Sequence, residues 1–149
     1  MRKRIVSRLL KLRSDFEKSK KNELLVSVAK RIDKQKEIAD IKKKYTKASE
    51  EFNEVISKGV PSSHLASFLQ YFGGARSDIK RKEKELKNLV SEEENKRTEY
   101  IEMRKERQIA ENLKNRIEKM ETTKQQKRNE KILDDSVLSK FSIEKNEKK

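Results

Sequence analysis

The sequence predicts an all-α protein, a long antiparallel two-helix coiled-coil hairpin with unequal arms. Only 32% of the residues are hydrophobic and 44% are charged, which is too little apolar material to fill a globular interior at native packing density. The 149 residues include three Gly and one Pro, although loops and sheets need such turn residues. Apolar residues recur at steps of three and four, the spacing of a coiled-coil seam.

The first predicted helix covers residues 3–58, a segment without Gly or Pro. Its apolar residues follow a heptad rhythm, which slips once and then continues toward residue 58. The members of this stripe include Ile5, Leu9, Leu12, Phe16, Ile38, Ile41, Tyr45, Ala48, Phe52 and Val55. So narrow a stripe stays aligned when two helices wind around each other, and it therefore predicts a partner helix.

A turn is predicted at residues 59–62, where Gly59 and Pro61 stand close together. Gly accepts the positive φ that often follows a helix end, and Pro cannot continue a helix but tolerates the first turn of the next. Ser62 or Ser63 is expected to act as the N-cap of the second helix. The turn therefore folds the second helix back along the first.

The second predicted helix covers residues 63–140 and keeps the rhythm of the first. Several of its seam positions are polar, namely Lys82, Glu93, Lys96 and Arg107. Gly73-Gly74 is its one interruption and allows either a close helix approach or a bend. At 1.5 Å per residue the two arms would be about 80 Å and about 115 Å long. Roughly twenty residues of the longer arm, from about Met120 onward, are therefore expected to lack a partner. Residues 1–141 would form a single domain, and residues 142–149 a disordered basic tail.

The residue types that enzymes need are scarce in this chain. His64 is the sole histidine, there is no cysteine, and no glycine-rich phosphate loop is present. The abundant carboxylates are expected on helix surfaces, where i,i+4 pairing rather than a raised pKa is typical. We therefore predict no catalytic residues, no metal site, no cofactor and no enzymatic activity. No apolar run approaches the ~18 residues that cross a bilayer.

Two features could bind partners. Five of the eight aromatic residues fall between Tyr45 and Phe72, and they form either a hydrophobic knot that closes the hairpin or a docking patch. Leu69 and Tyr71 are expected to point partly away from the seam. Residues 1–21 hold nine Lys and Arg against two acids. This basic end is either general surface charge, a surface for a protein partner, or a phosphate-binding arm for nucleic acid.

Three segments resemble the FliJ family, the small coiled-coil protein of the bacterial flagellar export apparatus. They are the opening "RLLKLRSDFEKSKKNELL", the turn "SKGVPSSHLASFLQYFGGARSDI" and the closing "KRNEKILDDSVL". The resemblance covers about residues 5–141 and departs from the family pattern at Gly73-Gly74. The type III injectisome stalk proteins share this architecture and remain an alternative. So do a nucleic-acid-binding coiled coil and a scaffolding coiled coil.

The resemblance implies a stalk protein of flagellum biogenesis and type III protein export. Such proteins insert their terminal coiled coil into the hexameric export ATPase and bind the cytoplasmic domain of the export-gate membrane protein. They also handle export chaperones. We further predict that this protein binds no nucleic acid, does not insert into the membrane, and works in the cytoplasm at the inner membrane face. By position, the gate-binding residues would be Ile41, Tyr45, Ala48, Phe52, Phe68, Tyr71, Phe72 and Ala75. The ring-inserting residues would be Arg4, Arg8, Leu9, Leu12, Leu133, Asp134 and Leu138.

Overall fold

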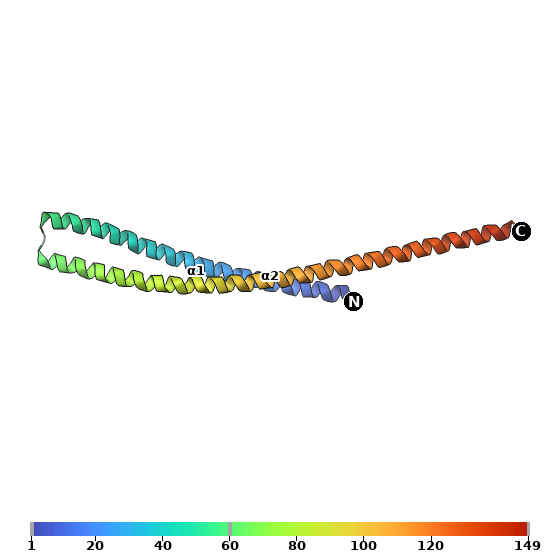
Figure 1. Cartoon of the computed structure of the whole chain (residues 1–149), viewed down its shortest axis with the longest axis horizontal. Coiled ribbons are helices and arrows are strands. Elements are labelled where there is room, and N and C mark those ends of the chain that lie inside the picture. The colour runs from blue at the N-terminus through green and yellow to red at the C-terminus, as the bar shows by residue number, and fades with distance from the viewer. Residues whose placement is uncertain (1, 60, 149) are drawn as a thin grey trace. The chain divides into compact units, whose positions relative to one another are not determined.

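The computed structural model describes residues 2–59 and 61–148 and contains two helices in that part of the chain (Figure 1). Helix α1 covers Arg2–Lys58 and α2 covers Ser62–Glu147, with 57 and 86 residues respectively. Within the described ranges no strand is present. The all-α hairpin with unequal arms that the sequence predicts is therefore confirmed.

The connection between the helices follows the predicted turn, of which Val60 lies outside the described residues. Gly59 has a φ of 80° and donates its N–H to the carbonyl of Ile56 at 3.2 Å. This left-handed conformation suits Gly, which has no Cβ to clash there. The carbonyl of Pro61 accepts the N–H of His64 at 3.0 Å, so Pro61 rather than either serine holds the N-cap position. Ser62 and Ser63 already belong to the helix, and the predicted serine cap is wrong.

Helix α2 runs further than the sequence predicts. It ends at Glu147 instead of residue 140, so residues 142–147 are helical where a disordered tail was expected; Lys149 lies outside the described residues. No Gly or Pro follows Gly74 to stop the helix, and Lys and Glu have good helix propensity. The division into a hairpin of residues 1–141 and a tail stays a prediction.

The Gly73-Gly74 pair lies inside α2 without interrupting it. A Cβ placed on either glycine would meet nothing within 4 Å, and neither glycine has a positive φ. Within the chain itself, neither a close helix approach nor a special backbone conformation therefore requires these two glycines.

Contacts divide the chain into two compact units. The turn unit contains Lys18–Glu102, which is the later part of α1, the turn and the first part of α2. The terminal unit contains the start of α1, up to Glu17, and α2 from Met103 onward. Each unit thus consists of one segment from each helix, and each is described by itself below.

The core of both units is thin. The hydrophobic residues that count as buried are Val6, Ile38, Phe72 and Ala110, with 4–8% of their surface exposed. No large described side chain is less than 2% exposed. Two helices alone cannot enclose a side chain completely, because each seam residue has solvent on two sides. The small apolar content of the sequence is therefore enough for this fold.

In the terminal unit, α2 extends beyond the part of the chain that packs against α1. Every described residue from Lys119 to Lys148 is exposed, and Met120 is 65% exposed. The unpartnered segment therefore begins where the sequence predicts it, close to Met120.

Candidate functional site

An aromatic cluster lies at the turn end of the turn unit and is made by Tyr45 and Phe52 of α1 and by Phe68, Tyr71 and Phe72 of α2. Phe72 is at its centre, with ring centroids 5.2 Å from Tyr45, 5.5 Å from Phe52 and 5.7 Å from Tyr71. These three pairs have edge-to-face geometry, which the quadrupoles of aromatic rings favour. The Nε of Arg76 donates a hydrogen bond to the Tyr45 hydroxyl at 3.0 Å and closes one side of the cluster.

Beside this buried centre lies an exposed apolar surface. Leu65, Leu69 and Tyr71 are 38%, 58% and 45% exposed, as the helical spacing predicts for Leu69 and Tyr71. An adjacent cavity of about 350 Å³ is lined by Ala48, His64, Ser67, Phe68 and Tyr71. The cluster therefore closes the hairpin and also presents apolar side chains to solvent. A hydrophobic knot and a docking patch, the two interpretations that the sequence left open, are thus compatible.

The structure brings most of the predicted gate-binding residues together. The five aromatic residues contact one another, and Ala48 shares the cavity wall with Phe68 and Tyr71. Ile41 and Ala75 are half-buried and lie about one helical turn farther from the hairpin turn. What any of these residues bind stays a prediction.

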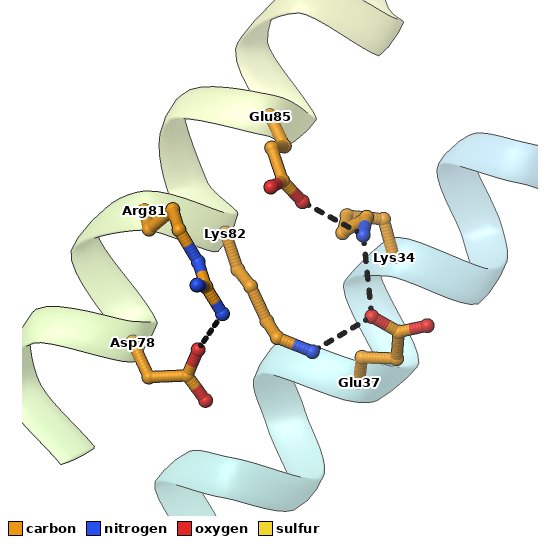
Figure 2. A network of polar contacts seen from close by, with 6 residues as sticks. All are labelled: Lys34, Glu37, Asp78, Arg81, Lys82 and Glu85. Carbon is orange, nitrogen blue, oxygen red and sulfur yellow. Dashed lines mark hydrogen bonds and ion pairs between the residues drawn. The ribbon is translucent and has the colours of Figure 1, made fainter. Parts of the chain in front are cut away.

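Farther from the turn, charged side chains replace apolar ones along the seam of the turn unit. Two quartets have the same composition, a Lys-x-x-Glu from each helix. In the quartet of Figure 2, the Nζ of Lys34 donates to Glu85 at 2.9 Å, and the Nζ of Lys82 donates to Glu37 at 3.0 Å. Lys34 also reaches Glu37 on its own helix, at 3.3 Å. Both cross-helix bonds pair a lysine of one helix with a glutamate of the other.

The second quartet lies two heptads away and joins Lys20 and Glu23 of α1 to Lys96 and Glu99 of α2. Lys20 donates to Glu99 at 3.2 Å, and Lys96 donates to Glu23 at 3.1 Å. Exposed ion pairs add little stability individually. Since a shift of one residue along the seam would place these charges out of reach, the repeated quartets specify the antiparallel register.

The quartets shift the pKa values of several members. Hydrogen bonds from Lys82 and then Lys34 lower the pKa of Glu37, and the bond from Lys34 lowers that of Glu85. The pKa of Lys34 is raised by its bonds to Glu85 and Glu37. In the second quartet, bonds from Lys96 and then Lys20 lower the pKa of Glu23. Each of these shifts favours the charged form of the residue concerned.

Between the two quartets, Glu93 is the buried charged residue of the described chain, with 6% of its surface exposed. Arg31 of α1 donates to one of its carboxylate oxygens, and Arg97 of α2 donates to the other at 3.1 Å. Polar seam positions on α2 were noted in the sequence, but their partners on α1 were not identified. The Lys-x-x-Glu repeat in both arms was the signal that could have revealed them.

The predicted ring-inserting residues fall into two groups in the terminal unit. On α1, Arg4, Arg8 and Leu12 are exposed and Leu9 is half-buried. On α2, Leu133 and Leu138 are 64% and 67% exposed, and Asp134 is exposed as well. The α2 group lies within the unpartnered segment and lines neither of the cavities at the start of α1. The structure therefore does not pair the two groups with each other.

Sequence reasoning missed a basic groove at the start of α1 in the terminal unit. A cavity of about 570 Å³ there is lined by Arg2, Arg116, Ile117, Lys119, Met120, Glu121, Thr123, Lys124 and Lys127. A neighbouring cavity of about 620 Å³ is lined by Lys3, Arg4, Ser7, Arg8 and Glu121. The lysines spaced along residues 119–127 were the available signal.

No group of His, Cys, Asp or Glu in the described part of the chain is arranged to hold a metal ion. Among the same residues, no helical stretch is long and apolar enough to cross a membrane. His64 is exposed at the turn, where it borders the small cavity.

Two long helices, a thin ion-paired seam and an exposed aromatic surface define a coiled-coil hairpin protein. The family model described as "Flagellar FliJ protein" matches residues 4–146, essentially the whole chain. The chain therefore belongs to the FliJ family, as the sequence resemblance predicts. No curated protein and no solved structure resembles it closely enough to count as a match.

Family membership makes this a flagellar, export-related protein. The family is a structural part of the flagellar export apparatus rather than a family of enzymes. The match also favours the flagellar system over the injectisome alternative.

Proposed function

We propose that this protein is the central stalk of the flagellar export apparatus and links the hexameric export ATPase to the export gate. The terminal unit would insert into the ATPase ring, and the aromatic cluster would bind the cytoplasmic domain of the gate protein. ATP hydrolysis would be carried out by the ring. The stalk would act in the cytoplasm at the face of the inner membrane, where it could also hand over export chaperones.

The observation that carries the gate assignment is the exposed apolar surface beside Phe72. Aromatic side chains near the centre of an interface often contribute most of its binding energy. Tyr71 contacts Phe72 on one side and is 45% exposed on the other. The aromatic ring of Tyr71 can therefore contact a partner protein while its packing against Phe72 holds this side chain in place.

Gate binding is tested by comparing Tyr71→Ala with Phe16→Ala, since Phe16 is also 45% exposed but lies in the terminal unit. Tyr71→Ala is expected to weaken binding of the purified gate domain by about 2 kcal/mol, a roughly thirtyfold rise in Kd. Phe16→Ala should leave this Kd unchanged. Titration calorimetry measures both, with circular dichroism to verify helicity. Equal affinities of the two variants would contradict the gate assignment.

The ring assignment has its own test in Arg4→Glu/Arg8→Glu. Both side chains are exposed, and neither makes an ion pair with another described residue. The double substitution is expected to reduce stimulation of the export ATPase severalfold, because charge at a docking surface steers association. The matched control is Lys84→Glu/Lys87→Glu, which changes the net charge equally on exposed residues of the turn unit. If the Arg4→Glu/Arg8→Glu protein stimulates the export ATPase as strongly as the unchanged protein does, the assignment of these residues to ring insertion is wrong.

A further inference from the structure

The described residues that line the basic groove in the terminal unit carry an excess of positive charge. Its 570 Å³ cavity is bordered by five cationic side chains and one acidic side chain; the cations are Arg2, Arg116, Lys119, Lys124 and Lys127. Among the described residues none of the five cations forms a salt bridge, whereas lysines along the seam of the turn unit are paired with glutamates. Repulsion between like charges makes this arrangement unfavourable in isolation.

The start of α1 increases the positive potential of the groove. The first turn of α1 contains no acidic residue and begins with Arg2, Lys3 and Arg4. The unpaired N–H groups at a helix N-terminus carry a partial positive charge, which stabilises acidic residues and destabilises basic ones. A groove with this charge pattern is complementary to an anionic partner.

The lining of the groove also has an apolar part. Ile117 and Met120 contribute to it, and 65% of the Met120 surface is exposed. Ile117 is half-buried and continues the stripe of α2 that contains the buried Ala110. The apolar strip therefore lies where a further helix could extend the seam. A methionine on a binding surface adapts its flexible side chain to the partner.

We infer that this groove binds an acidic amphipathic helix from another protein, which packs as a third helix against the two segments of the terminal unit. Its apolar residues would cover Ile117 and Met120, and its carboxylates would pair with the lysines and arginines along the rims. This is the helix-in-groove mode of recognition. The groove lies on the same terminal unit that is proposed to enter the ATPase ring, but none of the residues that line its 570 Å³ cavity was assigned to ring insertion.

Other polyanions fit the groove less well. Proteins that bind single-stranded nucleic acids commonly stack bases on aromatic side chains, and among the described residues no aromatic side chain lines either cavity. Phosphate backbones also offer no apolar surface to cover Ile117 and Met120. Helices that bind an anionic membrane have one broad apolar face, whereas here two apolar residues share the lining of a cavity with a glutamate.

Fluorescence anisotropy of the full chain tests the inference. The probe is a fluorescein-labelled helical peptide of about 20 residues, long enough to form an isolated helix, with leucines on one face and glutamates beside them. Binding with a Kd below about 100 µM is expected. A scrambled peptide of the same composition, a DNA duplex and vesicles of anionic phospholipid should all bind more weakly. Absence of peptide binding, or tighter binding of any of the three competitors, would overturn the inference.

Matched charge reversals locate the site. Lys124→Glu/Lys127→Glu is expected to raise the peptide Kd at least about tenfold, because two rim attractions become repulsions. Lys84→Glu/Lys87→Glu should change it by less than about twofold, although the net charge falls equally. Met120→Gln should weaken binding severalfold without changing its salt dependence. Equal effects of the two charge reversals would show that net charge alone drives peptide binding. That result would refute the groove as the binding site. ATPase stimulation is a separate readout, so failure here leaves the proposed stalk function untouched.

Discussion

The two adjacent glycines of α2 offer the clearest test of how this sequence specifies its fold. In a helix interior Gly is less favourable than Ala by about 1 kcal/mol, because it loses more backbone freedom on folding. Gly73 and Gly74 have helical backbones, and a methyl group on either would enter open space. Gly73→Ala/Gly74→Ala is therefore expected to stabilise the protein by about 2 kcal/mol.

Thermal unfolding followed by circular dichroism at the helix minimum measures this change. For a chain of this length, 1 kcal/mol corresponds to roughly 2–4 °C in Tm, so a rise of about 4–8 °C is expected. Gly59→Ala is the matched control, and it is expected to lower the Tm instead of raising it. Gly59 has a φ of 80°, and Ala in that conformation costs about 1 kcal/mol or more.

An unchanged or lower Tm for the double alanine variant would refute the reasoning, because it would mean that the helix needs flexibility or an unoccupied surface at this position. A further outcome concerns function. If the variant is more stable but binds the gate domain less well, the glycines serve the partner rather than the chain, since they follow the aromatic cluster directly.

The remaining predictions concern the seam and the aromatic cluster. Glu93→Gln should lower the free energy of unfolding in urea by about 1 kcal/mol, because Arg31 loses a charged acceptor; an effect below about 0.3 kcal/mol would mean that Glu93 is not needed there. The Tm should fall slightly as the pH drops below about 4.5, the ordinary pKa of these carboxyls. Since the folded-state pKa values of Glu23, Glu37 and Glu85 are lowered, their contribution to stability is present above that pH and is lost as the pH falls through the folded values. A Tm that stays constant down to pH 2 would show that these ion pairs do not stabilise the fold. Phe72→Ala should destabilise the turn unit by about 3 kcal/mol, near the low end for such truncations because neighbouring rings remain partly exposed; a loss similar to that of Tyr71→Ala would show that Phe72 is not the centre of the cluster.

The sequence alone was sufficient to predict both helices, their order and the turn between them. These features depend on local chemistry, namely the absence of Gly and Pro, the heptad spacing and the freedom of Gly59 to adopt a positive φ. The start of the unpartnered part of α2 was predictable too, because it depends only on the two arm lengths. The N-cap and the end of α2 were not, since several residues near a helix terminus can satisfy its free backbone groups.

The binding surfaces, too, were predictable from the sequence only where they depend on local helical spacing. Helical spacing was enough to expect Leu69 and Tyr71 partly outside the seam, because one stripe of a helix faces its partner. It could not reveal that Lys34 meets Glu85 or that Arg31 meets Glu93, because these pairs depend on the relative register of segments more than fifty residues apart. Register is decided by all seam contacts acting together, so only the tertiary structure assigns each charge its partner. The same holds for the basic groove, where α1 begins beside residues of α2 that are more than a hundred positions away in the sequence.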